Sequence, residues 1–478
     1  MTVRLCNASL DQFSAATRPG YDRRSVKPGI VHIGIGNFHR AHQAVYTDDV
    51  LQSGDYRWGI VGASLRSETM QYQLAPQNWL YTLSIHDRER IKHRVIGAIQ
   101  EVLTLARQRN RLINLIASPE IKVVTLTITE KGYCLDENSD LDLNHTDIRN
   151  DIRQPALPVS APGLIAEGLR RRQHGAAGPI SIISCDNLGD NGGVTERVLE
   201  RLLTEQGSFE SGWLQDNVTF PGTMVDRIVP QTTADARAGF TKETGMIDEG
   251  LVICEPFSQW VIEDRFAGER PAWESAGAQL TDNVATWETA KLRLLNASHS
   301  ALAYLGLLAG YEFIHEAVAD PLLAGFVRRM LDQEVSPVIE YPPQLDLNAY
   351  RDQILERFAN PAIPYRTAQV ATDGSKKLPQ RVFPTIMECR EQGLECPGLC
   401  LVVAAWLRCR ADSTTASRFS DPDTEFIAEY GGPDLLSHVV TDSTLLGPVG
   451  NENTLSASIN AALSSLEGDL ATAVRQLI

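Results

Sequence analysis

The stretch GIVHIGIGNFHRAHQAVYTDDVLQSG, residues 29–54, decides the fold. It opens with a short apolar run, continues through two glycines, and ends in an amphipathic helical pattern. Such an order predicts a buried strand, a tight turn and a helix. Helical patterns then alternate with β-branched runs as far as PISIISC, residues 179–185. This alternation predicts an α/β unit in which helices cover both faces of a parallel sheet.

The glycine turn at the end of the first strand is the first candidate site. Gly34-x-Gly36 allows a tight turn and lets the backbone approach a pyrophosphate. The third position of the dinucleotide fingerprint is His39, so the fingerprint is incomplete, and the glycines alone fit a plain strand-to-helix turn equally well. Their place in the first strand of an alternating region favours a Rossmann-type site. We expect Gly34, Gly36, Asn37 and Phe38 to contact the cofactor.

The second strand, YRWGIVGASL, ends near Arg66 and bears on the choice of cofactor. An acid at this point binds the adenosine ribose in NAD-dependent folds. Glu68 is the candidate, although its distance from the glycines exceeds the usual ~20 residues. Arg66 would instead favour a 2′-phosphate. We expect NAD rather than NADP.

His39 and His42 stand three residues apart in the following helix. Two histidines could share a metal, but no carboxylate or thiolate follows at ligand spacing. We expect helix packing, capping or a cofactor contact instead, and no metal site. The eight cysteines are scattered without a C-x-x-C pair, as expected for reduced core residues.

The character of the chain changes near Trp287. Leu/Ala-rich helical patterns dominate from there, over residues 287–309, 321–333, 346–358, 398–410 and 455–477. The stretch 411–423 is rich in Ser, Asp and Thr and predicts a surface loop. We therefore expect a Rossmann-type domain over residues 1–284 and a mainly helical domain over residues 285–478.

The first of these helices, WETAKLRLLNASHSALAYLGLLAGY (287–311), is apolar yet carries several polar groups. At about 100° per residue, Lys291, Asn296 and His299 fall within an arc of roughly 140°, and Glu288 lies inside it. A buried polar group is costly unless it has a partner or a task. Each residue alone could be a satisfied core residue, or in the case of lysine reach solvent. Together, after a nucleotide-binding fold, they favour an active site.

Hydride transfer to or from a secondary alcohol needs a nicotinamide cofactor, an acid/base, and donors for the reacting oxygen. The sequence has no clear zinc-ligand cluster. Burial would lower the pKa of Lys291 towards working pH, so this lysine can serve as the acid/base. Asn296 can donate to the reacting oxygen. Asn187 follows a strand at the ligand-binding edge of the sheet and can complete that site, while His299 suits a substrate hydroxyl.

KLRLLNASH resembles the Lys-x-x-x-x-Asn-x-x-His signature of the polyol-specific long-chain dehydrogenases, the mannitol dehydrogenase family. GIGNFHRAHQA, TITEKGY, SCDNLGDNG, MVDRIVP, CEPFSQWVIED and DGSKKLPQR extend the resemblance over residues 29–385. It implies a metal-independent, NAD-linked enzyme in which the signature lysine is the general acid/base and two asparagines form the oxyanion hole. These roles fall on Lys291, Asn296 and Asn187.

The resemblance implies further roles around these three. Asp226 and His299 would contact substrate hydroxyls. Glu288 would pass the proton to solvent, one turn before the lysine.

The resemblance implies that the substrate is a sugar acid or a polyol. TITEKGYC, MVDRIVP, SHSALAYLG and KLPQR resemble the fructuronate reductases, also called mannonate oxidoreductases, whereas GIGNFHRAHQAVY is at least as close to the mannitol 2-dehydrogenases. Lys376, Lys377 and Arg381 would bind a uronate carboxylate; alternatively they line a domain interface or a solvated face. Arabinitol dehydrogenase and a non-catalytic nucleotide sensor are the remaining alternatives.

Composition limits the partners. The formal net charge of −16 argues against nucleic acid and anionic membranes as partners, because both attract basic patches. The run GIVHIGIG is too short to span a bilayer, and the N-terminus lacks the pattern of a secretory signal. We expect a cytoplasmic enzyme that acts on a small molecule.

Overall fold

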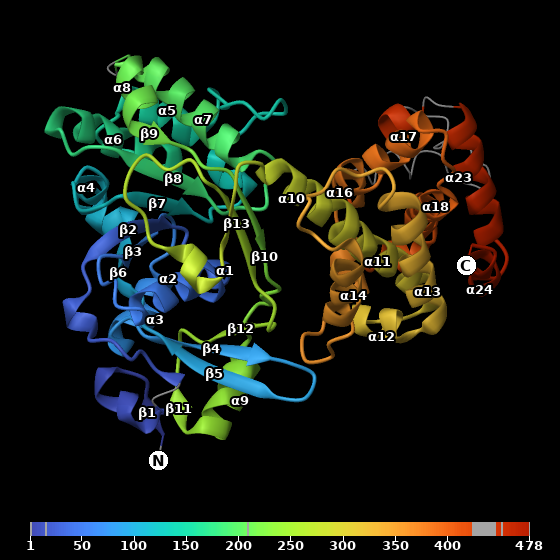
Figure 1. The fold of residues 1–478 in the computed structure, drawn as a ribbon, viewed down its shortest axis with the longest axis horizontal. Coiled ribbons are helices and arrows are strands. Elements are labelled where there is room, and N and C mark those ends of the chain that lie inside the picture. The colour runs from blue at the N-terminus through green and yellow to red at the C-terminus, as the bar shows by residue number, and fades with distance from the viewer. Residues whose placement is uncertain (1, 15–16, 208–209, 423–445, 451–452, 478) are drawn as a thin grey trace. The chain divides into compact units, whose positions relative to one another are not determined.

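The computed structural model describes residues 2–14, 17–207, 210–422, 446–450 and 453–477. The chain divides into two compact units, Met1–Val284 and Ala285–Ile478 (Figure 1). Within the described part of the chain, no helix has both the length and the apolar character that crossing a membrane requires.

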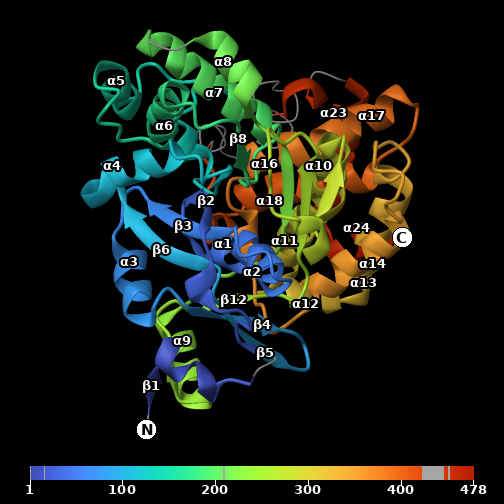
Figure 2. The ribbon, with the colours of Figure 1, turned by 60° about the vertical axis from the view of Figure 1, so that its left-hand side comes forward.

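A six-stranded sheet organises the N-terminal unit. Its strands lie in the order β6 (Ile99–Thr104), β3 (Gly59–Ser64), β2 (Pro28–Ile33), β7 (Val123–Leu126), β8 (Ile180–Ser184) and β9 (Val218–Thr219). Every neighbouring pair is parallel. Figure 2 shows β6, β3 and β2 side by side in this order. The predicted parallel sheet is confirmed.

Alternate residues of the central strand β2 point to opposite faces of this sheet. Val31 and Ile33 belong to a core with three helices: α4 (Leu105–Ile116), α6 (Ala161–Gly175) and α7 (Asn191–Gln206). Ile30 belongs to a second core, with α2 (Gln43–Gln52) and the buried Trp58. Because both faces are buried, β2 reads as a nearly continuous apolar run.

Three smaller sheets complete the N-terminal unit, and the sequence did not predict them. They comprise β12 (Val252–Cys254), β4 (Tyr81–His86) and β5 (Ile91–Ile96); β10 (Thr223–Asp226), β13 (Gln259–Glu263) and β14 (Gln279–Thr281); and β1 (Val3–Arg4) with β11 (Met246–Ile247). The first 28 residues show no regular pattern and would be expected to be irregular, yet they contain β1 and the 3-10 helix Asn7–Gln12. Strand β1 forms through a partner distant in the chain, so its own residues give no signal.

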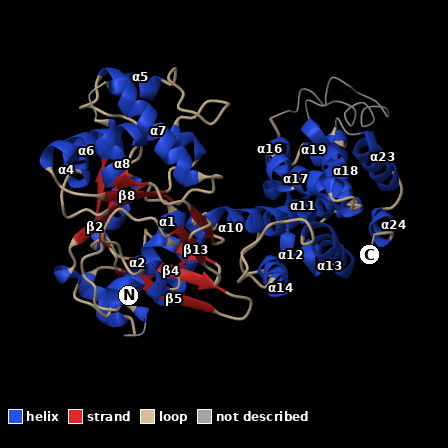
Figure 3. Ribbon diagram, turned by 45° about the horizontal axis from the view of Figure 1, so that its top comes forward, coloured by secondary structure: helices blue, strands red, loops and turns tan. Residues whose placement is uncertain are grey.

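The C-terminal unit consists of helices joined by loops (Figure 3). The predicted helix 287–309 is three consecutive segments: α10 (Val284–Ala290), the π-helix Lys291–Asn296 and α11 (Ala297–Ala309). Helices α13 (Pro321–Met330), α14 (Leu347–Phe358) and α18 (Pro397–Ala411) lie where patterns predicted them. The predicted helix 455–477 is two, α23 (Asn453–Leu466) and α24 (Leu470–Arg475), because Asp469 caps a new helix.

Shorter helices escaped prediction. They are α12 (Ile314–Ala319), α15 (Thr367–Ala371), α16 (Gly374–Arg381), α17 (Phe383–Glu391) and α19 (Ser413–Ala416). The last lies within the predicted loop 411–423, whose final residue is outside the described residues. Helices α11 and α18 are buried along most of their length and form the centre of this unit.

Candidate active site

The two glycines of the turn after β2 have different physical roles. Gly34 has a φ of 99°, and a Cβ there would lie 2.0 Å from the carbonyl oxygen of Thr127. Only glycine fits this position. At Gly36 a Cβ would meet nothing nearer than the Gly34 oxygen, at 4.0 Å. Gly34 is therefore required by the fold, whereas Gly36 leaves open space beside the backbone, as a bound pyrophosphate requires.

The helix after the turn is short. Helix α1 (Asn37–Ala41) ends at His42, whose φ and ψ of −127° and −92° separate it from α2. The Asn37 side chain accepts a 2.6 Å hydrogen bond from Arg40, and Phe38 stacks on His42 with ring centroids 5.0 Å apart. Both predicted cofactor residues thus have contacts within the turn region, and their contact with a cofactor stays a prediction.

His39, at the third fingerprint position, stacks on His32 with ring centroids 3.3 Å apart. Both rings are buried, and burial lowers the pKa of His32 to about 3 and that of His39 well below its usual value. His32 shares hydrogen bonds of 2.7 and 2.9 Å with the hydroxyls of Thr125 and Thr127. The two imidazole rings are therefore neutral at pH 7, and His32 packs beneath the glycine turn through its hydrogen bonds to Thr125 and Thr127. Among the described residues, no group of three or more His, Cys, Asp or Glu side chains could hold a metal ion.

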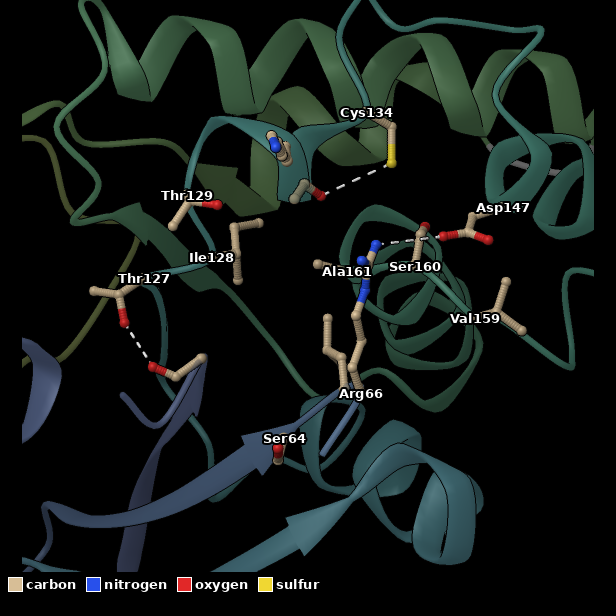
Figure 4. A pocket seen from close by; sticks show the side chains of 14 residues that line it. Ser64, Arg66, Thr127, Ile128, Thr129, Cys134, Asp147, Val159, Ser160 and Ala161 are labelled. Carbon is tan, nitrogen blue, oxygen red and sulfur yellow. Dashed lines mark hydrogen bonds and ion pairs between the residues drawn. The ribbon is translucent and has the colours of Figure 1, made fainter. Parts of the chain in front are cut away.

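A cavity of about 340 Å³ lies at the carboxyl ends of β2, β3 and β7 (Figure 4). A doubly wound sheet binds nucleotides at this edge. The lining comprises Gly34, Ser64, Leu65, Arg66, Thr127, Ile128, Thr129, Lys131, Gly132, Cys134, Asp147, Val159, Ser160 and Ala161. It therefore combines the glycine turn, the end of β3 and the start of α6 in one site.

Of the two charged residues that follow β3, Arg66 lines this cavity and Glu68 does not. The strand ends at Ser64, and Glu68 stands at the start of helix α3 (Thr69–Leu74). Its carboxylate accepts from the Tyr72 hydroxyl at 2.9 Å and pairs with Arg107 at 2.5 Å, and these bonds lower its pKa. The predicted contact between Glu68 and the ribose stays a prediction.

Asp186, which was not predicted to belong to the site, organises the loop after β7. Its carboxylate accepts from the amides of Ile128 (3.0 Å) and Thr129 (2.8 Å) and from the Tyr133 hydroxyl (2.8 Å). Thr129 has a φ of 61°, so these bonds hold a strained turn. The aspartate precedes Asn187, and its position after a strand could have drawn attention to it.

The two residues of this unit that were predicted to contact the substrate lie at strand ends. Asn187 follows β8 and is exposed. Asp226 is the last residue of β10, is buried, and lies opposite Gln259 of β13. Their approach to the residues of the helical unit stays a prediction.

In the helical unit, Lys291 and Asn296 begin and end one π-helical segment. In an α-helix, residues five apart differ by about 500°, which leaves them roughly 140° apart around the axis. A π-helix bonds residue i to residue i+5, so residues five apart lie about one turn from each other. The segment therefore brings the two side chains onto one face. Both are buried, as predicted.

Arg293 fastens this segment to helix α17. It donates a 2.6 Å hydrogen bond to the Thr385 hydroxyl and pairs with Glu388 at 3.3 Å. This role was not predicted, although Arg293 lies inside the signature KLRLLN. Its partners are remote in the chain, so only the folded structure reveals them.

His299 lies on helix α11, and Arg381 contacts the same helix. His299 stacks on Phe358, with centroids 4.8 Å apart, and meets the edge of Tyr365 at 5.7 Å. Arg381 lies 3.2 Å from the hydroxyl of Ser300, which is one helical turn after Asn296. Because Ser300 follows Asn296 by four residues, the guanidinium of Arg381 lies on the same side of the helix as Asn296.

The three cations of helix α16 differ in environment. Lys376 is exposed, whereas Lys377 and Arg381, one turn apart, are partly buried. Lys377 donates to the Val370 carbonyl oxygen at 3.3 Å. Burial lowers the pKa of both Lys377 and Arg381, and the charge of Arg381 lowers that of Lys377 further. An anion bound between them would relieve this repulsion.

The fold and these sites define a dinucleotide-binding oxidoreductase with a helical second domain. Residues 28–275 match the mannitol dehydrogenase Rossmann domain, and residues 283–467 match the mannitol dehydrogenase C-terminal domain. The chain belongs to the mannitol dehydrogenase family.

The relatives of this chain are named for two different activities. The D-mannonate oxidoreductase of Escherichia coli K12 is 40% identical over 404 residues, which cover 84% of this chain and 83% of the relative. A mannitol 2-dehydrogenase of Cereibacter sphaeroides is 36% identical over 468 residues, 96% of this chain and 98% of the relative. Pseudomonas fluorescens mannitol 2-dehydrogenase, solved in a ternary complex with NAD and D-mannitol, is 36% identical, with a TM-score of 0.86 and 99% coverage of both chains.

Proposed function

We propose that this protein is an NAD-dependent, metal-independent oxidoreductase that interconverts D-mannonate and D-fructuronate. One observation carries the choice of a sugar acid: Lys377 and Arg381 lie together on α16, with Arg381 bonded to Ser300 beside His299. A carboxylate gains charge-assisted hydrogen bonds from such a pair, and a neutral polyol does not.

The glycine turn and the cavity beside it fit NAD. The space at Gly36 suits a pyrophosphate, and the cavity at the ends of β2, β3 and β7 suits an adenosine. Bound NADH supplies the hydride for the C5 ketone of fructuronate. A family member solved with NAD and D-mannitol supports this choice of cofactor.

The helical unit provides the acid/base. Lys291 donates a proton to the C5 oxygen as that oxygen gains charge, and Glu288, one turn earlier, passes a proton from solvent. Asn296 lies on the same face of the π-helical segment and donates a hydrogen bond to the nascent alkoxide. Asn187 completes this oxyanion site from the Rossmann unit.

The remaining residues orient the substrate. His299, held between Phe358 and Tyr365, and Asp226, at the end of β10, bind its hydroxyls. Arg381 and Lys377 bind the carboxylate, and Lys376 contributes a third positive charge from the exposed side of α16.

Mannitol 2-dehydrogenase is the second candidate. The relatives with that name match this chain over nearly its whole length, and one of them binds D-mannitol. In that case Lys377 and Arg381 would donate hydrogen bonds to neutral substrate hydroxyls, or would serve only to stabilise the fold.

The deciding experiment compares kcat/KM for D-fructuronate and D-fructose, each reduced with NADH. We expect fructuronate to be the better substrate by at least the roughly tenfold that one charge-assisted contact is worth. If fructose is better, mannitol 2-dehydrogenase replaces our proposal. Tight NADH binding with no turnover across a wider panel of ketoses, arabinitol-derived ketoses included, would indicate a nucleotide sensor.

A further inference from the structure

The nucleotide cavity contains an ion pair near the end of β3. The guanidinium of Arg66, which follows that strand, lies 3.8 Å from the carboxylate of Asp147 on helix α5 (Thr146–Arg153). Both residues line the cavity, and Figure 4 shows their side chains pointing toward each other. The Arg66 side chain is 81% exposed, so it is available to a ligand.

The position of Arg66 matters because β3 is the strand whose end meets the adenosine ribose in a Rossmann fold. Lys131, another cation of the lining, comes from the 3-10 helix Glu130–Tyr133 after β7, on the other side of the central strand β2. Of these two cations, Arg66 is therefore the one at the ribose end of the cavity.

The carboxylate expected to read the ribose is engaged elsewhere. Glu68 pairs with Arg107 and accepts from Tyr72, and it does not belong to the lining. Asp147 is the acidic residue that does line the cavity. The negative charge of the cavity lining thus comes from α5, a helix remote from β3 in the sequence.

We propose that Asp147, paired with Arg66, makes this chain select NAD(H) over NADP(H). The inference rests on the proposed function. A 2′-phosphate carries nearly two negative charges. Asp147 repels that phosphate and partly offsets the positive charge of the guanidinium that would bind it. Without Asp147, Arg66 is a free donor of the geometry that phosphates favour.

The test measures binding and needs no turnover. Dissociation constants for NADH and NADPH are obtained by fluorescence titration at fixed ionic strength, for the wild type, Asp147→Asn, Arg66→Ala and the double variant. We expect the wild type to bind NADH more tightly. Asp147→Asn should tighten NADPH about tenfold, the equivalent of one charge-assisted contact, with NADH changed less than about threefold. The double variant should lose that gain.

Glu101→Gln is the matched control. Glu101 pairs with Arg111 on the same unit, outside the cavity lining, so its loss removes one negative charge without touching the pair. It should leave the ratio of the two dissociation constants unchanged.

Two results would overturn the inference. One is an Asp147→Asn variant whose NADPH affinity matches the wild type. The other is a Glu68→Gln variant that shifts the ratio as strongly as Asp147→Asn, which would return ribose recognition to Glu68. If the wild type binds neither nucleotide, the proposed function itself fails; if it binds NADH but the ratio ignores Asp147, only this inference fails.

Discussion

Lys291 and Asn296 are the first and last residues of a single π-helical segment, and both are buried. The wider turn brings onto one face two side chains that an α-helix would separate by roughly 140°. A backbone irregularity, rather than the spacing of the residues alone, thus positions the proposed acid/base beside the proposed alkoxide donor.

Lys291→Ala should keep NADH affinity and lower kcat by at least the ~10²-fold typical of a lost acid/base. The measurements are fluorescence titration for binding and steady-state kinetics for turnover. A small amine in the buffer should restore part of the rate. Treatment with a chelator should leave the wild type unaffected. Nearly normal turnover in the variant would mean that Lys291 is structural.

Arg293→Ala tests whether the π-helical segment must be held in place. Losing the bonds to Thr385 and Glu388 should let the segment shift, and displacements of about 1 Å can cost up to 10²-fold in rate. We expect kcat to fall at least tenfold with NADH affinity nearly unchanged, and the pH profile of kcat to move. Arg328→Ala, which breaks an exposed pair with Asp352, is the control and should leave kcat unaltered.

Arg381→Ala and Lys377→Ala test the carboxylate site. Losing a charge-assisted hydrogen bond costs about 1.5–3 kcal/mol, or roughly ten- to a hundredfold in kcat/KM. This loss should appear with fructuronate and be small with fructose. Equal losses with both substrates would point to a structural role for α16. If the preference for fructuronate over fructose is unchanged in both variants, the activity stands and the carboxylate binds elsewhere.

The two glycines of the turn should respond differently to alanine. Gly34→Ala forces a methyl group against the Thr127 carbonyl oxygen at a φ of 99°, so it should lower the free energy of unfolding by more than about 1 kcal/mol. Gly36→Ala has room and should leave stability unchanged while weakening NADH binding. Urea denaturation and NADH titration on both variants separate the effects. Equal stability losses would contradict the assignment.

Acid should destabilise the Rossmann unit through His32. Its pKa is lowered to about 3 by burial, while the unfolded chain has the ordinary value of about 6.5. The unfolded state therefore binds a proton that the folded state does not, and the stabilisation present above pH 6.5 is lost as pH falls towards 3. The slope is about 1.4 kcal/mol per pH unit.

His32→Asn isolates this contribution. Between pH 6.5 and pH 5, wild-type stability should fall by roughly 2 kcal/mol more than that of the variant, as measured by denaturant unfolding. Parallel losses in both proteins would show that other groups cause the acid sensitivity.

The sequence predicted the Rossmann sheet because strands β2, β7 and β8 are locally apolar and the helices between them are amphipathic. It did not predict β1, whose partner β11 is remote in the chain. Nor could periodicity reveal the π-helix, because Leu292 to Leu295 fit an α-helix equally well. The local sequence predicts local conformation. Strand β1 and the π-helix depend instead on tertiary contacts, which the local sequence does not reveal.

For the site, the sequence placed Lys291, Asn296 and His299 on one apolar helix, and burial of the first two follows from that pattern. The bond between Arg381 and Ser300 joins elements that are far apart in sequence. The lining of the cavity by Arg66 rather than Glu68 depends on the residue at which β3 ends, and strand ends are the least predictable feature of a sequence.

The pairing of Val3–Arg4 with Met246–Ile247 has a consequence for biosynthesis. A ribosome that adds about 5–20 residues per second needs roughly 10 to 50 seconds to reach β11 after it has made β1. During that time β1 has no strand to join, although the central sheet can already assemble from β2 to β9. Strand β1 is thus made first, yet it is among the last parts of the N-terminal unit to pair with its partner strand.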